Sequence, residues 1–252
     1  MVNFFRIKSC HIAIATFMLF ILIIVKNNLR FNNEIKSNRH EQSKSNDADE
    51  LPILKEYFKN IYNKSVWQSV ISSKVLQTTI KFMIEGVDEY DPELIDFVRT
   101  LIHPPSDRSQ LRLFDISKRD YSQHSQSSKI DNLLNQQKNG FFIESGAFNG
   151  EILSNTLFFE LERNWTGLLI EPITHSYVDL VRKRRNVYSI NACIADKTPS
   201  VTKFMMSFEY SGLENEMTSE RKAYLSKEKL IIGYIYVPCF SLNTIMRALN
   251  RT

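Results

Sequence analysis

The sequence is poor in the residues and motifs that mark metal sites and common hydrolases. It has three cysteines, none of them in a C-x-x-C pair, and its five histidines form no pair at ligand spacing. A metal site is therefore not expected. No G-x-S-x-G elbow and no Walker-type loop occurs either, so the usual signatures of a serine hydrolase or a P-loop nucleotidase are missing.

A strong excess of one charge is also missing. The formal net charge is +4 with a pI near 8.8, and much of the excess lies near the N-terminus rather than on a patterned face. Binding to nucleic acid is therefore not expected. With 252 residues and 43% hydrophobic content, the chain can bury one globular core and a small helical appendage.

Charge is absent from the run "CHIAIATFMLFILIIV", residues 10–25. It is somewhat shorter than the ~20 residues that span a typical bilayer, but a thin membrane with snorkelling flanks accommodates it. The bulky residues that follow it do not suit signal-peptide cleavage, which favours an uncleaved signal anchor over residues 10–29. A cleaved signal peptide and a buried soluble helix are the alternatives. Basic residues flank the run on both sides, so charge alone leaves the orientation of the chain open.

The segments after the anchor differ sharply in composition. Residues 30–50 are polar and predict a flexible stem, whereas apolar residues return at helical spacing in a region that extends to residue 128. Asp91 and Pro92 supply an N-cap and a first helical residue for a helix that "HPP" at 103–105 ends.

Two features suit a lumenal compartment without requiring it. Cys193 and Cys239 are candidates for a disulfide, and the alternative is two small buried side chains in neighbouring strands. Glycosylation sequons begin at Asn63, Asn164 and Asn250, although about two would be expected by chance in such a chain.

Short strands and helices alternate over residues 129–252, which predicts an α/β domain with a Rossmann-like fold. A parallel sheet with helices on both faces is expected. The predicted elements are a strand at 140–143, a helix at 150–163, a strand at 166–170, a helix at 173–185, a strand at 187–195, further strands at 201–206 and 234–238, and a helix at 241–250.

Ligands of such sheets bind where strands turn into helices, which singles out Glu144, Gly146, Gly150 and Glu171. The stretch "ESGAFNG" has a carboxylate where a dinucleotide fingerprint has its first glycine, and this carboxylate would repel a pyrophosphate. Cationic S-adenosylmethionine fits better. In this interpretation Glu144 attracts its charge, Gly146 permits a tight turn, Gly150 opens the helix, and Glu171 accepts hydrogen bonds from the ribose.

Plainer interpretations remain for the same residues. The glycines could form an ordinary strand-to-helix turn, with both glutamates as solvated strand ends. The run "RKRR" at 182–185 could bind phosphate, but cations in the last turn of a helix are favoured by its dipole, and we prefer that interpretation.

Several separated blocks, "GFFIESGAFNGE", "NWTGLLIEP" and "VPCFSLNTIM", resemble the FkbM-type methyltransferase domain, specifically the version in the insect Star family. Upstream, "DPELIDFVRTLIHPPS" and "YSQHSQSSKIDNLLNQQKNG" also resemble Star-family sequence. The resemblance implies a single-pass type II membrane protein with residues 1–9 cytosolic and a methyltransferase-like domain, 129–252, in the lumen. It further implies residence in the endoplasmic reticulum and Golgi, with endosome and plasma membrane as further locations, and a role in exporting EGF-like ligand precursors or other secretory cargo.

The resemblance also implies that the domain is C-terminally incomplete. FkbM-type domains continue past the helix matching "SLNTIMRALN" into a strand with an acidic D-x-E-G signature beside the transferred methyl, and this sequence stops at Thr252. We therefore expect the sheet to lack a central strand, and S-adenosylmethionine to be either a real cofactor or the ligand of a vestigial site. An active O-methyltransferase with a lumenal substrate is the alternative function, for which the sequence offers no credible base.

Overall fold

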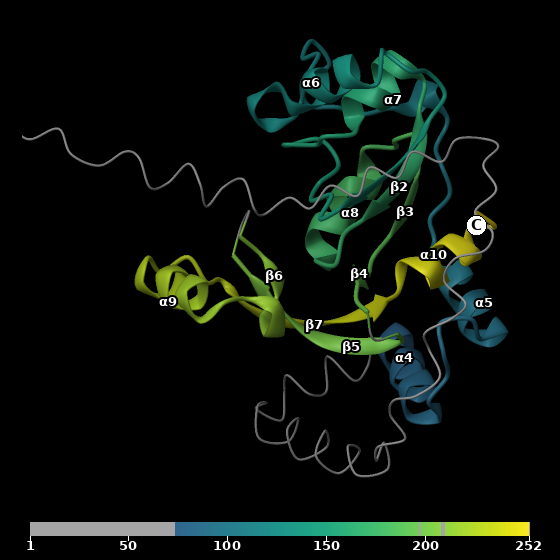
Figure 1. Ribbon diagram of the computed structural model, residues 1–252, viewed down its shortest axis with the longest axis vertical. Coiled ribbons are helices and arrows are strands. Elements are labelled where there is room, and N and C mark those ends of the chain that lie inside the picture. Colours follow the sequence, from purple (N-terminus) through teal and green to yellow (C-terminus); the bar gives the residue numbers. More distant parts are fainter. Residues whose placement is uncertain (1–73, 197, 208–209, 252) are drawn as a thin grey trace, which may run out of the picture.

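The computed structural model describes residues 74–196, 198–207 and 210–251, which form a mixed α/β protein (Figure 1). The predicted signal anchor, the stem and Asn63 lie outside the described residues. None of the helices within the described ranges has the length and apolar character needed to cross a membrane.

Three parallel strands form the first sheet, in the order β1-β2-β3. They are β1 (Phe141–Ser145), β2 (Thr166–Ile170) and β3 (Tyr188–Ile190). Phe141 pairs with Thr166 and Leu168 with Tyr188, so the three strands start near the same edge and end together. The parallel arrangement predicted for this part of the chain is confirmed.

Alternate side chains of these strands point to opposite faces of the sheet, and helices cover both faces. Phe141, Ile143 and Ile170 pack against α4 (Lys74–Glu85), α5 (Pro92–Leu101) and α10 (Leu242–Ala248). Phe142 and Leu169 pack on the opposite side, in a cluster that includes residues of α6 (Gln126–Leu133), α7 (Leu157–Arg163) and α8 (Thr174–Arg182). The strands are therefore buried on both faces, which explains their nearly unbroken apolar sequence.

Two glycines allow large rings to lie against the sheet. A Cβ on Gly167 would approach the Phe142 ring to 2.2 Å, and one on Gly140 would approach the indole of Trp165 to 2.4 Å. Both rings are fully buried. A side chain at either glycine would force a well-packed core to shift.

A long connection between α5 and α6 covers the outer edge of β3. It contains the short 3-10 helices η1 (Arg108–Gln110) and η2 (Gln123–Ser125). His103 and Ser189 form an antiparallel bridge, and the N–H of Ser106 donates to the carbonyl of Arg185. We call residues 103–121 the strap, because they run across the sheet edge and the adjoining helices.

The second sheet departs from the predicted parallel arrangement. Its order is β4-β7-β5-β6, and only β4 and β7 run parallel. Its elements are β4 (Cys193–Ile194), β5 (Ser200–Met206), β6 (Gly212–Leu213), η3 (Glu214–Glu216), α9 (Ser219–Lys227) and β7 (Gly233–Phe240). The chain between β5 and β6 is too short for a crossover, so these strands reverse direction. Figure 1 shows this sheet and α9 extending away from the first sheet.

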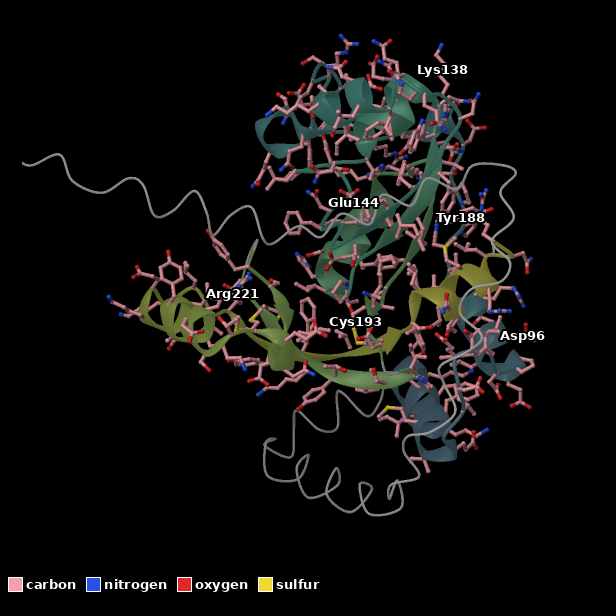
Figure 2. All side chains as sticks on the ribbon, in the orientation of Figure 1. Asp96, Lys138, Glu144, Tyr188, Cys193 and Arg221 are labelled. Carbon is pink, nitrogen blue, oxygen red and sulfur yellow. A yellow bond between two sulfur atoms is a disulfide. The ribbon has the colours of Figure 1, made fainter. Side chains whose placement is uncertain are left out.

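The predicted strand 187–195 is divided between the two sheets. Residues 188–190 form β3 and residues 193–194 form β4. Cys193 of β4 lies directly opposite Cys239 of β7, with their Cα atoms 4.4 Å apart, and the two cysteines form a disulfide. Figure 2 shows the Cys193 disulfide where the two sheets meet.

Helix starts and ends were predicted with mixed success. The cap of α5 is confirmed, because the Asp91 carboxylate accepts a hydrogen bond from the N–H of Leu94 and Pro92 is the first helical residue. The predicted helix 150–163 is wrong over its first half, since α7 begins only at Leu157. Leu153 has a left-handed backbone, and Leu161 is exposed rather than part of a buried stripe.

Candidate functional site

The candidate site is the loop from Gly146 to Thr156, which links the carboxyl end of β1 to α7. Gly146 has a φ of +76°, and its N–H donates to the carbonyl of Ile170. A Cβ at Gly146 would meet nothing within 4 Å, so the space beside this turn is open. The tight turn predicted at Gly146 is thus present.

Gly150 has a different role from the predicted one. It lies in the middle of the loop, also with a φ of +76°, and does not open the helix. A Cβ here would come within 3.2 Å of the Leu180 side chain. Gly150 therefore allows the loop to pass close to α8.

Glu144, the last buried residue of β1, uses both carboxylate oxygens inside the protein. One oxygen accepts from the N–H of Asn155 at 2.9 Å, and the other accepts from the hydroxyl groups of Ser154 and Thr156. The residue is 5% exposed. Glu144 thus holds the returning end of the loop to the strand. Figure 2 shows it in the interior of the part that contains the first sheet.

Arg185, in the connection before β3, completes this polar cluster. Its Nε donates to Glu160 at 2.7 Å, and an NH group lies 3.8 Å from the Glu144 carboxylate. Its other donors reach the carbonyl of Gly150 and the hydroxyls of Ser154 and Thr156. The Arg185 side chain is only 1% exposed, and buried charges are costly unless they are paired and hydrogen-bonded. Arg185 is paired with Glu160, and all three of its side-chain nitrogens donate hydrogen bonds.

A second buried pair lies nearby and attaches the strap. The Glu151 carboxylate accepts from the ammonium of Lys183 and from the N–H groups of Phe114 and Asp115. Burial by itself would raise the pKa of Glu151, but these hydrogen bonds hold the pKa below its usual value. The carboxylate therefore stays charged and joins three parts of the chain.

These contacts revise the preferred interpretation of "RKRR". Helix α8 ends at Arg182, and the residues after it alternate between inside and outside. Lys183 and Arg185 are buried in ion pairs with Glu151 and Glu160. The helix dipole accounts for Arg182 at most, so two of the four cations are internal structural groups.

Glu171 lies just beyond β2, at the position predicted to bind a ribose. Its two oxygens accept from the N–H groups of Phe148 and Ile173, each at 2.8 Å. Burial raises its pKa to about 7, and the two hydrogen bonds only partly oppose this rise. Since Phe148 belongs to the loop, Glu171 connects the loop to the end of β2.

The structure thus brings Glu144, Gly146, Gly150 and Glu171 around one loop. It also adds Glu151 and Glu160, which were not selected from the sequence, together with Lys183 and Arg185, which were interpreted as cations at a helix end. Their signal was weak: each lies within a segment that otherwise reads as an ordinary amphipathic helix or helix end. Glu151 follows β1 and Lys183 precedes β3, so the two become neighbours only in the folded sheet β1-β2-β3.

The sequons in the described part lie at the surface. Asn164 is exposed at the end of α7 with a φ of +56°, and its amide donates to Asn139. Asn250 is exposed just after α10 and accepts from Arg99 at 3.4 Å. Both asparagines are accessible in the folded protein.

Comparisons with protein-family models, with curated proteins and with solved structures gave no match to this chain. Within the described ranges, no three His, Cys, Asp or Glu side chains gather in a way that could hold a metal ion.

Proposed function

We propose that the chain is a Star-like, single-pass type II membrane protein of the secretory pathway. In this proposal its methyltransferase-like domain lies in the lumen and assists the export of EGF-receptor ligand precursors, or other secretory cargo, from the endoplasmic reticulum through the Golgi. The proposal rests on the resemblance of several ordered sequence blocks to the Star family.

The fold supports treating these blocks as parts of one unit. "GFFIESGAFNGE" forms β1 and the start of the loop, and "NWTGLLIEP" forms the adjacent strand β2. "VPCFSLNTIM" forms the end of β7 and most of α10, whose Ile245 packs in the same apolar cluster as Ile143 and Leu168. Blocks far apart in sequence therefore meet in one core.

One observation favours a binding role over catalysis. Both carboxylates selected for a cofactor are already engaged by protein donors, Glu144 by the 154–156 segment and Glu171 by Phe148 and Ile173. S-adenosylmethionine would have to displace buried hydrogen bonds, each of which costs free energy to leave unmade. This arrangement supports the interpretation of the loop as inherited architecture.

The second candidate is an FkbM-type O-methyltransferase with a lumenal substrate. It is favoured by the open space beside Gly146 and by the position of Glu171 at the end of β2. In that case Glu171 would exchange the N–H of Phe148 for a ribose hydroxyl, and the loop would move. The transferred methyl itself would come from S-adenosylmethionine.

The edge of β1 bears on the same alternative. Among the described residues, β2 is the only strand paired with β1. The N–H of Gly146 donates to the carbonyl of Ile170, and the N–H of Thr166 donates to the carbonyl of Gly140. The backbone groups of Gly140 and Gly146 therefore face β2. Because successive residues of a strand alternate in this respect, the backbone groups of Phe141 and Ile143 face the opposite edge of β1. The acidic strand that the resemblance places beside the transferred methyl would pair at this edge.

Export of a tethered EGF-family precursor in cells with and without the full chain tests the first proposal. We expect more precursor to leave the endoplasmic reticulum when the chain is present, and the Glu171→Gln variant to act like the unaltered chain. Export that does not respond to the chain would contradict the proposal.

Calorimetry with S-adenosylmethionine on the full chain in detergent separates the two candidates. The cargo proposal predicts no heat of binding. Binding that the Glu171→Gln variant loses, together with failure of that variant in the export assay, would favour the methyltransferase instead.

A further inference from the structure

Two of the most exposed large apolar side chains in the described part lie two positions apart on the strap. Phe114 is 81% exposed and Ile116 is 78% exposed. Neither belongs to an apolar cluster of the core. Single exposed apolar residues are ordinary, but an adjacent pair on one loop is a feature to explain.

The protein holds this pair outward with buried groups. The carboxylate of Glu151 accepts from the N–H of Phe114 at 2.8 Å and from the N–H of Asp115 at 3.0 Å. The hydroxyl of Tyr121, itself buried, donates to the carbonyl of Asp115 at 2.7 Å. The Lys183 ammonium lies 3.2 Å from the centre of the Phe114 ring. These contacts hold the backbone at residues 114 and 115 in place while the Phe114 and Ile116 side chains remain exposed.

Cations surround the pair. The strap carries Arg108, Arg112, Lys118 and Arg119, all exposed, against the three acidic residues Asp107, Asp115 and Asp120. Each of these carboxylates accepts hydrogen bonds from a serine two residues later, and these bonds lower the pKa of Asp107 and Asp115. The N–H of Arg112 donates to the carbonyl of Lys183, which brings the strap beside Arg182 and Arg184 at the end of α8. Two of these cations have acidic neighbours, since Arg119 lies 3.7 Å from the Glu162 carboxylate and Arg182 lies 3.1 Å from that of Asp179. Residues 112–119 themselves carry three cations and one carboxylate, which leaves this segment with a net positive charge.

An apolar pair flanked by long basic side chains matches the chemistry of a membrane interface, where apolar groups enter the headgroup boundary and cations attract anionic lipids. In the orientation of the proposed function, this interface is the lumenal leaflet. We propose that residues 112–119 form a membrane-contact loop, in which Phe114 and Ile116 insert while Arg112, Lys118 and Arg119 bind anionic lipid headgroups.

The sequence supplies a reason why such a small contact would suffice. If the run at residues 10–25 is a membrane anchor, as its composition predicts, the domain stays near the bilayer at high effective concentration. Lipid attachment commonly needs two weak signals, and the loop would provide the second. A protein hot spot would instead be expected in a packed pocket with water excluded at its rim. The loop has neither of these features.

The test uses the full chain reconstituted in nanodiscs of phosphatidylcholine, with and without phosphatidylserine. A Phe114→Trp variant reports insertion through quenching by lipids brominated on their acyl chains, after subtraction of the signal of the unaltered chain, which contains Trp67 and Trp165. We expect the added emission to lose most of its intensity with phosphatidylserine present and less without it. Emission that stays unquenched in both mixtures overturns the proposal.

Two further variants sharpen the result. Ile232→Trp is the matched control, because Ile232 is 60% exposed but lies next to β7 in the second sheet; its emission should not be quenched. Equal quenching of both tryptophans would overturn the proposal. Adding Arg112→Glu and Lys118→Glu to Phe114→Trp should remove the dependence on phosphatidylserine.

The anchor and the loop can fail separately. A chain that does not enter nanodiscs contradicts the predicted anchor, and the same quenching is then measured with added vesicles of the same lipids. A second protein that shifts the emission of the Phe114→Trp variant while brominated lipids leave it unquenched would assign the loop to a protein partner and overturn the proposal. Cargo export is not read in these measurements, so their outcome is independent of the proposed function.

Discussion

Around the parallel sheet β1–β3, buried cations and carboxylates hold the loop and the strap in place, whereas the sheet β4–β7 is held by apolar side chains and a disulfide. Arg185 and Lys183 pair with Glu160 and Glu151 in the first region, with all four side chains nearly inaccessible. In the second region the ion pair between Lys222 and Glu214 is partly exposed, at 3.4 Å. Exposed pairs contribute little to stability, whereas a broken buried pair is costly.

The difference concerns specificity as well as stability. Buried ion pairs are satisfied by one arrangement of their partners, so they fix the shape of the 146–156 loop, which is the candidate site, and of the strap, for which we propose membrane contact. A disulfide restrains β4 and β7 without dictating the positions of the surrounding side chains. The first region should therefore lose its shape when a charge is removed, and the second when its covalent bond is removed.

Replacing the buried cation should give the largest effect. Arg185→Met keeps much of the side-chain volume but leaves Glu144 and Glu160 buried without their cation. We expect a loss of about 3–5 kcal/mol in the free energy of unfolding, measured by denaturant titration of the full chain. The neighbouring Arg184→Met is the matched control, since Arg184 is only partly buried and bonds to Gln110 at 2.8 Å. Equal losses in both variants would contradict a special role for the buried cluster.

Removing the disulfide should give the next largest effect, confined to the other region. Its cysteines are 46 residues apart, for which the chain-entropy estimate is about 4 kcal/mol, and measured values are commonly about 2–4 kcal/mol. In the Cys193→Ser/Cys239→Ser variant we expect faster hydrogen exchange in β5 and β7, with β1–β3 unchanged. Mass spectrometry of the exchanged peptides would measure both regions at once. Faster hydrogen exchange in both sheets would show that the disulfide stabilises the whole domain.

Protonation of Glu171 provides a test within the first region. Its pKa is about 7 in the folded protein and near 4.5 when unfolded, so the folded state holds the proton more tightly. The contribution of the protonated Glu171 carboxyl to the free energy of unfolding is fully present below pH 4.5 and is lost as pH rises through about 7. Glu171→Gln cannot ionise, so its stability relative to the unaltered chain should increase by about 3 kcal/mol between pH 4.5 and 8.

The control for this measurement is the size of the pH-dependent difference, not the absolute stability of either chain. Glutamine can accept only one of the N–H bonds from Phe148 and Ile173, which lowers stability by a similar amount at every pH. A difference that is independent of pH would show that Glu171 titrates normally and is not strongly desolvated by burial.

Local features of the fold follow from the sequence more directly than long-range ones. The strand 166–170 and the cap at Asp91 depend on neighbouring residues, and both are confirmed. The helix predicted at 150–163 failed because Glu144 binds Asn155, Ser154 and Thr156 and holds the chain in turns until Leu157. Such a contact joins residues on opposite sides of the loop, so it produces no periodic pattern in the sequence from which it could be predicted. The antiparallel pairing of β5 and β7 was missed for the same reason, since alternating strand patterns do not encode direction.

Glycosylation should have the smallest effect on stability. It would modify the first region and leave the second region unmodified. Both sequon asparagines within the described residues, Asn164 and Asn250, adjoin elements packed on the first sheet, next to α7 and α10 respectively. If the domain is lumenal, as we propose, the expressed chain should run slower on a gel, and a glycosidase should remove the difference. Asn164→Gln should abolish one step of this shift, since Asn164 is exposed on a turn that the folded protein leaves accessible.

The matched control for that experiment is Asn139→Gln. Asn139 is also exposed, also has a positive φ and accepts the hydrogen bond from Asn164, but it begins no sequon. A shift lost in Asn139→Gln as well would indicate that the substitution disturbs the turn rather than the acceptor site. Absence of any shift in the unaltered chain, expressed in cells that glycosylate a lumenal reporter, would count against the proposed orientation. The buried ion pairs of the first region do not depend on the compartment, whereas the Cys193–Cys239 disulfide of the second region requires an oxidising one. A domain outside the lumen would therefore keep the first mode of stabilisation and lose the second.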